Sequence, residues 1–134
     1  HKNVIRGLHV QRVKEQPKLI RCISGCIFCA AVDIRMESST CGKWVSAELT
    51  EENGQELYVP GGCAVGTLAL EDSQFTCKCG ENYYGQYEDG VRWDDPDLKV
   101  AWPLQLLGGE PVISEKDRKL QGYQSYMKRN KGGI

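Results

Sequence analysis

The sequence lacks a marked excess of either charge, because 17 basic residues stand against 18 acidic ones and the formal net charge is -1. Nucleic acids and anionic membranes attract basic proteins, so we expect neither as a partner. The chain also lacks any apolar run near the roughly 20 residues that cross a bilayer. Its polar start lacks the apolar segment of a secretory signal. We therefore expect a soluble, cytoplasmic protein.

A length of 134 residues is enough for one domain with its own core and short for two. We expect a single domain over 1–134, with its core from about 4 to 103 and a C-terminal segment from about 104 to 134. In the second part, Trp93 and Trp102 are expected to be apolar anchors. Asp94 and Asp95 precede Pro96 and predict a turn.

Seven cysteines, at positions 22, 26, 29, 41, 63, 77 and 79, are an odd number and come without a secretory signal. Reduced cysteines that serve as small buried residues therefore fit better than a disulfide framework. A zinc site built from Cys26-x-x-Cys29 and Cys77-x-Cys79 is a minor alternative. Both pairs lie in strand-like runs without the turn that structural zinc sites use.

Short runs rich in Val, Ile, Thr and Tyr, separated by turn residues such as Asn53-Gly54, predict an all-β fold. Seven strands at this spacing indicate a sandwich, a barrel or a jelly roll. The expected strands are 4–11, 18–23, 26–35, 43–49, 55–59, 64–70 and 74–79.

Alternation along the strands assigns residues to faces. Lys18 shares a face with Ile20 and Cys22, so a lysine points the same way as apolar residues. This is unfavourable unless the lysine has an anionic partner or a wet cavity; the alternative is an edge lysine that blocks strand pairing. In the last strand, three residues share a face: Phe75, Cys77 and Cys79.

The run 4–11 carries the most suggestive chemistry, with His9 between Arg6 and Gln11. An imidazole accepts a proton near neutral pH, and Arg6 and Lys18 can neutralise an anionic substrate or an enolate oxygen. The alternative is an edge strand with one hydrogen-bonded histidine. Farther along, Ser114 is the expected N-cap of a short helix that has Asp117 in its first turn.

Eight short motifs follow one another between position 4 and about position 120. They are Arg6-Gly7-Leu8-His9-x-Gln11, Lys18-Leu19-Ile20, Val32-Asp33-Ile34-Arg35, Gly42-Lys43-Trp44, Tyr58-Val59-Pro60, Arg92-Trp93-Asp94-Asp95-Pro96, Trp102-Pro103 and Ser114-Glu115-Lys116-Asp117. Together they resemble the dTDP-4-dehydrorhamnose 3,5-epimerase family. The resemblance implies an all-β, cupin-type jelly roll (a double-stranded β-helix) with a short C-terminal helical segment, acting as a homodimer without metal or redox cofactor. Metal-binding cupins use a histidine cluster, and this chain has two histidines, His1 and His9.

The resemblance also implies substrates and roles. The substrates would be nucleotide-linked 4-keto-6-deoxy sugars, inverted beside the ketone at C3, C5 or both. His9 would be the base, Asp117 its carboxylate partner and Lys18 the cation beside the developing oxyanion. The alternative for Asp117 is a residue that merely belongs to a capped helix. The substrate-binding positions would be Arg6, Gln11, Lys116 and Val65.

Several departures from the family pattern concern the acid side of the reaction. A pocket histidine of the family is replaced by Val65, its acid tyrosine aligns on Cys77, and a carboxylate is replaced by Cys29. The family's N-terminal segment, which crosses to the partner subunit, is expected to be missing. A thiol of pKa about 8.5 can still donate a proton, whereas loss of a proton donor costs roughly 10²–10⁴-fold in rate.

Two hypotheses follow from these departures. The first is an epimerase, impaired if Cys77 replaces the tyrosine poorly. The second is a catalytically degenerate jelly roll that binds a sugar nucleotide or a protein partner. A zinc-bound regulatory protein is a distant third.

Overall fold

The computed structural model describes residues 1–131; the last three residues of the predicted C-terminal segment, 132–134, lie outside the described range. The all-β prediction is confirmed. The elements in chain order are β1 (Val4–Gln11), β2 (Lys18–Ser24), β3 (Cys26–Asp33), β4 (Trp44–Thr50), β5 (Glu56–Val59), β6 (Cys63–Ala69), β7 (Gln74–Cys79), the 3-10 turn η1 (Gly85–Tyr87), β8 (Glu88–Gly90), the 3-10 turn η2 (Leu104–Leu106), β9 (Val112–Ile113), α1 (Glu115–Arg118) and α2 (Tyr123–Asn130).

The seven predicted strands correspond to β1 to β7. The largest difference is at β3, which ends at Asp33 rather than at residue 35. Between residues 1 and 131, no helix has the length and apolar character needed to cross a bilayer.

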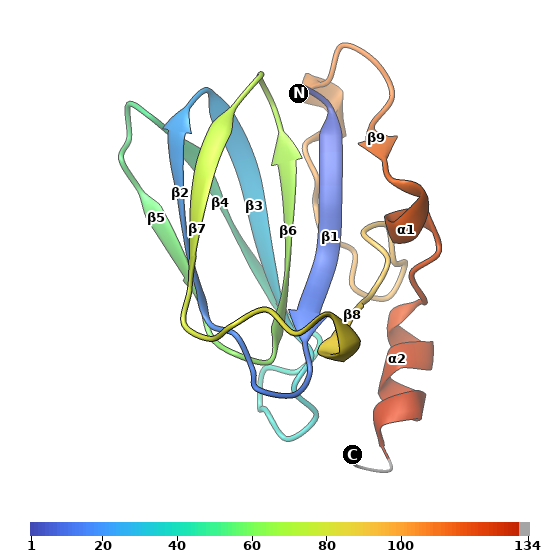
Figure 1. Ribbon diagram of the computed structural model, residues 1–134. Helices are drawn as coiled ribbons and strands as arrows, with labels where there is room; N and C mark the ends of the chain where they lie inside the picture. The colour runs from blue at the N-terminus through green and yellow to red at the C-terminus, as the bar shows by residue number, and fades with distance from the viewer. Residues whose placement is uncertain (132–134) are drawn as a thin grey trace.

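The strands form two sheets that face each other (Figure 1). The larger sheet has the order β4-β3-β6-β1-β8, with β9 paired to β1, and the smaller sheet has the order β5-β2-β7. The C-terminal part runs along the side of β1, where α1 and α2 lie (Figure 1). The helical segment is thus brought next to the strand that carries His9.

The larger sheet is covered on both faces, and β3 shows this most clearly. Ile27, Cys29 and Ala31 pack between the two sheets with residues of β2 and β5. The alternate residues Ala30 and Val32 pack on the outer face, against the C-terminal segment. This explains why β3 is an almost continuous apolar run rather than an alternating one.

Trp102 is the main anchor of the C-terminal segment on that outer face. Its side chain is 7% exposed, and its ring centroid lies 5.5 Å from that of Phe28 on β3. Its indole Nε1 donates a hydrogen bond of 2.8 Å to the carbonyl oxygen of Trp93. The predicted role of the two tryptophans as apolar anchors is confirmed.

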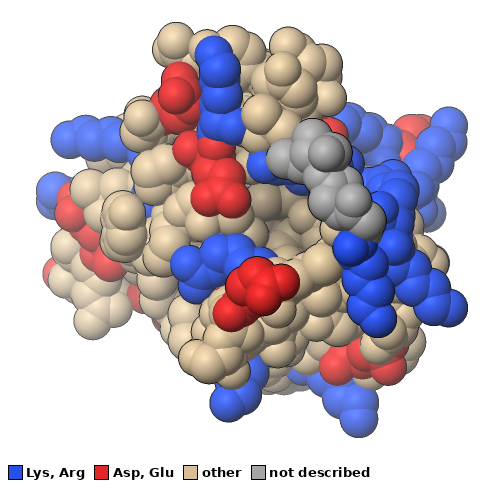
Figure 2. All heavy atoms as spheres, turned by 90° about the horizontal axis from the view of Figure 1, so that it is seen from below, with Lys and Arg blue, Asp and Glu red and all other residues tan. Residues whose placement is uncertain are grey.

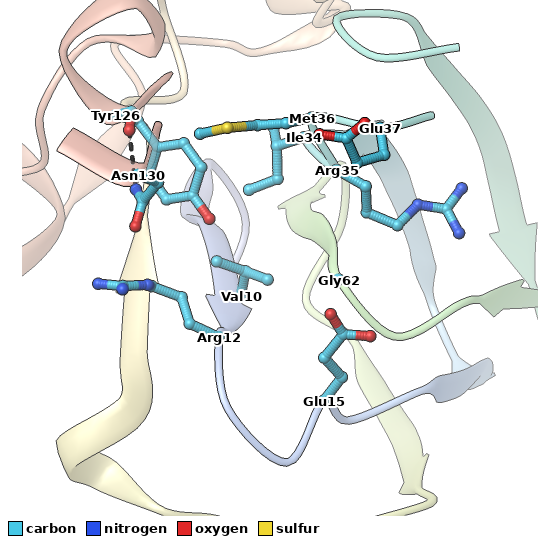
Figure 3. A pocket seen from close by; sticks show the side chains of 10 residues that line it. All are labelled: Val10, Arg12, Glu15, Ile34, Arg35, Met36, Glu37, Gly62, Tyr126 and Asn130. Carbon is cyan, nitrogen blue, oxygen red and sulfur yellow. Dashed lines mark hydrogen bonds between the residues drawn. The ribbon is translucent and has the colours of Figure 1, made fainter. Parts of the chain in front are cut away.

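Charged side chains of both signs are mixed on the lower face of the molecule (Figure 2). A hollow of about 310 Å³ near this end lies between β1, the segment after β3 and α2. Figure 3 shows Val10 of β1 and Tyr126 of α2 on its wall, with Arg12 and Glu15 from the β1–β2 connection. Because Val10 belongs to the outer-face cluster, this hollow lies on the other side of the sheet from the inward-facing side chains of β1.

Asp33, at the end of β3, organises the loop that leads to β4. One carboxylate oxygen accepts hydrogen bonds of 3.0 Å from the backbone N–H and the Nε of Arg35. The other accepts from Arg35 Nη2 and from the hydroxyls of Ser38 and Thr40. The Arg35 guanidinium and these donors outweigh burial and hold the pKa of Asp33 far below its usual range.

We expect Asp33→Asn to lower the free energy of unfolding by about 2 kcal/mol, the scale of a buried hydrogen-bonded charge. Because the folded-state pKa of Asp33 is depressed, its stabilisation is present above its unfolded pKa of about 3.9 and is lost as the pH falls through the lower folded value. Urea unfolding of wild type and variant should therefore differ by a constant amount from about pH 5 to 8 and converge in acid. Asp97→Asn, at an exposed position, is the control; an equal loss there would refute the assignment.

Candidate active site

His9 faces the interior of the sandwich because of an extra residue in β1. Arg6 pairs with Thr67 of β6, and His9 pairs with Val65, so β1 uses three steps where β6 uses two. Such a bulge resets the alternation of side chains. As a result Leu8 joins the outer-face cluster, while Arg6 and His9 both lie on the inner face.

The extra residue is Gly7. Its φ is +111°, and a Cβ there would lie 2.6 Å from the backbone oxygen of Val65. A side chain at this position would therefore push β1 away from β6.

Asp117 of α1 joins the bulge to the imidazole. Its Oδ1 lies 2.6 Å from His9 Nε2, and its Oδ2 accepts a hydrogen bond of 3.0 Å from the backbone N–H of Gly7. Asp117 is 3% exposed, whereas the His9 side chain keeps 26% of its surface open. With the carboxylate on Nε2–H, neutral His9 has its lone pair on Nδ1 and can accept a proton there.

The short helix holds this carboxylate in place. Ser114 is its N-cap, and the Ser114 hydroxyl oxygen accepts a hydrogen bond of 3.1 Å from the backbone N–H of Asp117. The N-cap prediction is confirmed. Asp117 belongs to a capped helix and also contacts His9. Its place in the helix and its contact with the imidazole are therefore compatible.

The inner faces of both sheets meet at a hollow of about 240 Å³. β1 of the larger sheet contributes His9 and Gln11, and the smaller sheet contributes Lys18 from β2 and Cys77 from β7. Lys18 pairs with Cys79 and Ile20 pairs with Cys77, so these residues share the inner face. The prediction that Lys18 points the same way as Ile20 is confirmed, and its side chain lines the hollow.

Cys77 is held in its thiol form. Burial in the wall of the hollow, and next the neighbouring thiol of Cys79, raise the pKa of Cys77 to about 11. The residue as a whole is exposed, and its side chain lines the hollow. A proton donor of pKa about 11 is close to a phenol, whose ordinary pKa is about 10. At neutral pH the thiol keeps the proton that a general acid must give.

The family model described as dTDP-4-dehydrorhamnose 3,5-epimerase matches residues 1–125. The chain belongs to the dTDP-4-dehydrorhamnose 3,5-epimerase family. It is 48% identical over 118 residues to the dTDP-4-dehydrorhamnose 3,5-epimerase of Methanothermobacter thermautotrophicus, covering 87% of this chain and 63% of that protein. With the Escherichia coli enzyme it shares 42% identity over 121 residues, which are 89% of this chain and 64% of that protein. The chain spans less than two thirds of the length of these relatives.

Solved structures of epimerases have the same fold. The rmlC epimerase of Mycobacterium tuberculosis superposes with a TM-score of 0.91 at 35% identity, over 96% of this chain and 65% of that one. ChmJ, a 3'-monoepimerase from Streptomyces bikiniensis in complex with dTDP-quinovose, superposes with a TM-score of 0.89 at 27% identity, over 97% of this chain and 65% of that one. These likenesses confirm the predicted cupin-type jelly roll.

The remaining substrate-binding positions predicted for this epimerase-family chain lie in different places. The amide of Gln11 lines the hollow but is used within the protein: Nε2 donates to the carbonyl oxygens of Lys14 and Asn82, and Oε1 accepts from the backbone N–H of Tyr84. Gln11 therefore shapes the wall rather than offering a free polar group. Arg6 lines a separate hollow of about 310 Å³ farther along β1.

Val65 lies opposite His9 on β6 and packs in the core between the sheets. Val65 is paired with β1 through its backbone, but its side chain does not line the hollow that His9 lines. The position that the resemblance assigned to a pocket histidine thus holds an apolar side chain directly beside the base.

Lys116 is linked to the hollow by an ion pair with Glu88, which lines it. Glu88 is a residue that the sequence did not indicate. Glu88 Oε2 accepts hydrogen bonds of 2.6 Å from Lys116 Nζ and 2.9 Å from the Tyr83 hydroxyl. Burial raises the pKa of Glu88, but these two donors outweigh it, so its pKa is below the usual range. Glu88 comes from the three-residue strand β8, beside Gln11, and so short a strand has no periodicity to reveal it.

Metal ligands do not converge in the described part of the chain, where no group of three or more His, Cys, Asp or Glu side chains could hold an ion. Cys26 packs on the outer face of β3 and Cys29 on the inner face. The two thiols of this Cys-x-x-Cys pair cannot bind one ion.

We expect Gly7→Ala to lower the free energy of unfolding by about 2 kcal/mol or more, because both the positive φ and the contact with Val65 oppose a side chain. The matched control is Gly54→Ala, where φ is +58° and nothing lies within 4 Å. It should cost only about 1 kcal/mol, the penalty of the left-handed conformation. Denaturant unfolding of both variants measures this, and equal losses would show that the close approach at Gly7 is unimportant.

Proposed function

We propose that this chain epimerises a nucleotide-linked 4-keto-6-deoxy sugar, as a dTDP-4-dehydro-6-deoxyglucose 3,5-epimerase does. The observation that carries the proposal is the His9–Asp117 pair, with 2.6 Å between Nε2 and Oδ1, facing a hollow whose other wall holds Lys18 and Cys77. Inversion needs a base on one face of the sugar ring and an acid on the other. The two sheets supply one candidate each.

His9 is the proposed base. A hydrogen beside a ketone becomes acidic enough for imidazole only when the resulting enolate is stabilised. His9 Nδ1 takes this proton, and Asp117 stabilises the imidazolium that forms on the other side of the ring. The ammonium of Lys18 attracts the negative charge that develops on the ketone oxygen. These steps move protons only and need no redox cofactor.

Cys77 is the proposed acid. Its thiol donates a proton to the face of the enolate opposite His9, so the carbon returns with inverted configuration. The raised pKa of about 11 keeps the proton available at neutral pH, and exposure at the rim lets solvent reprotonate the thiolate. The impairment suggested by the loss of tyrosine would then be partial.

A sugar nucleotide is the proposed ligand. Relatives were solved with such molecules: the Legionella pneumophila enzyme with dTDP-4-keto-L-rhamnose and ChmJ with dTDP-quinovose. The hollow of about 240 Å³ is below the usual 300–1,000 Å³ of a whole-ligand pocket. It suits the sugar alone, and we place the nucleotide and diphosphate outside it, with Arg6 as a candidate partner for their charge.

A homodimer is part of the proposal, and it rests on the family resemblance. The smaller sheet has β5 and β7 at its edges in the described range, and unpaired edges are where a second chain can add. Sedimentation analysis measures the state directly.

A second function, binding without turnover, is favoured by one observation. Val65, which pairs with His9, and Cys29 replace polar residues of the family, and both are buried between the sheets. Neither side chain lines the hollow, so neither offers a bound sugar the hydrogen bond that a polar residue at its position would, and the sugar would be less well oriented. Whether hydrogen exchange occurs separates this alternative from the epimerase.

The test of the base is incubation with dTDP-4-dehydro-6-deoxyglucose in D₂O, followed by proton NMR at C3 and C5. We expect deuterium to enter one or both positions and expect His9→Ala to abolish its entry, because the other histidine, His1, lines a different hollow. Dissociation constants for dTDP, measured alongside, separate loss of chemistry from loss of binding. Intact dTDP binding without any deuterium entry would refute the epimerase and support the binding protein.

The test of the acid uses the same experiment with Cys77→Ala and Cys77→Tyr. We expect Cys77→Ala to keep deuterium exchange but lose inversion by roughly 10²-fold or more, because the base survives and the donor is gone. Cys77→Tyr should recover inversion. Cys63→Ala, a half-buried cysteine away from the hollow, is the control. Unchanged inversion in Cys77→Ala would remove Cys77 from the mechanism.

A further inference from the structure

Cys77 and Cys79 form a pair of neighbouring thiols at the mouth of the hollow. Both lie on the inner face of β7, and their Sγ atoms are 3.8 Å apart. Of the seven cysteines, all within the described range, these two are exposed, whereas Cys22, Cys26 and Cys29 are buried. A dissolved oxidant therefore reaches this pair first.

The backbone places the pair at the limit of disulfide geometry. Residues two apart along a strand have Cα atoms roughly 6.6–6.8 Å apart, and disulfides span up to about 6.8 Å. A bond there would strain β7, and strained, exposed disulfides are the easily reduced ones. β7 can yield to this strain, because it is exposed along its length and pairs only with β2 in the described sheets.

We infer that Cys77 and Cys79 are a reversible redox site, oxidised to an intramolecular disulfide by small-molecule disulfides such as glutathione disulfide. One thiol of the pair attacks glutathione disulfide and releases one molecule of glutathione. The other thiol then attacks the mixed disulfide and releases the second. Two protein thiols and one glutathione disulfide thus become one protein disulfide and two glutathione thiols.

Oxidation would act on the site in two ways. Cys77 loses the hydrogen that it donates, a consequence that rests on the proposed function. The bond also draws β7 together around Lys78, which pairs with Leu19 next to Lys18. The cation and the acid of the hollow are thus disturbed by one modification.

The experiment equilibrates the reduced protein with mixtures of glutathione and glutathione disulfide, quenches with acid and alkylates the remaining thiols after denaturation. Peptide mass spectrometry should show that the peptide carrying Cys77 and Cys79 has lost two hydrogens and carries no alkyl group. The other five cysteines should be alkylated. Cys63→Ser, the matched control, should form the same disulfide. Cys79→Ser should leave Cys77 alkylated or bound to glutathione.

Three results would overturn the inference: both thiols alkylated at the most oxidising ratio, a persistent glutathione adduct in wild type, or a bond from Cys77 to Cys29. In the activity arm, oxidised wild type should lose inversion by about 10²-fold or more. Dithiothreitol should restore it. Cys79→Ser should form no intramolecular disulfide, so any loss of inversion in this variant should match the fraction of Cys77 that carries glutathione. If reduced protein shows no hydrogen exchange, the proposed function fails, yet the mass spectra still decide the disulfide.

Discussion

The Asp117 carboxylate is the contact on which the site depends. One oxygen holds the His9 ring and the other holds the backbone of Gly7, so a single buried group fixes the base and the bulge that aims it inward. The carboxylate reaches this position because Ser114 caps α1 and because the C-terminal segment is packed on the larger sheet. The outer-face core, which has no chemistry of its own, therefore determines the geometry of the inner face.

Turn residues and β-branched runs were enough to predict the seven long strands, because turn-forming Gly, Pro, Asn, Asp or Ser residues lie in the segments between them. They could not predict β8 and β9, of three and two residues, which form because β1 offers partners on its free edge. Local sequence does not reveal a strand of that length, since its pairing energy comes from a distant segment.

The site was predictable where alternation holds. Lys18 with Ile20, and Cys77 with Cys79, lie on the inner face as their spacing indicates. In β1 plain alternation fails: it would put His9 on the same face as Ile5 and opposite Arg6, and the bulge at Gly7 reverses this. The partnership of His9 with Asp117, across 108 residues, came from the family resemblance, because no periodicity links positions so far apart.

The double-sided burial of β3 has a consequence for how the sheet finds its register. A strand with one wet face resists a slip of one residue, because the slip would expose its apolar side. β3 has no such protection, since either face is acceptable to a core. Asp33 supplies it instead: it is the one charged residue of β3, and a slip that moved it one place into the sheet would put its carboxylate among apolar neighbours, where an ion is costly. The charged residue at the end of β3 thus fixes the register of this apolar strand.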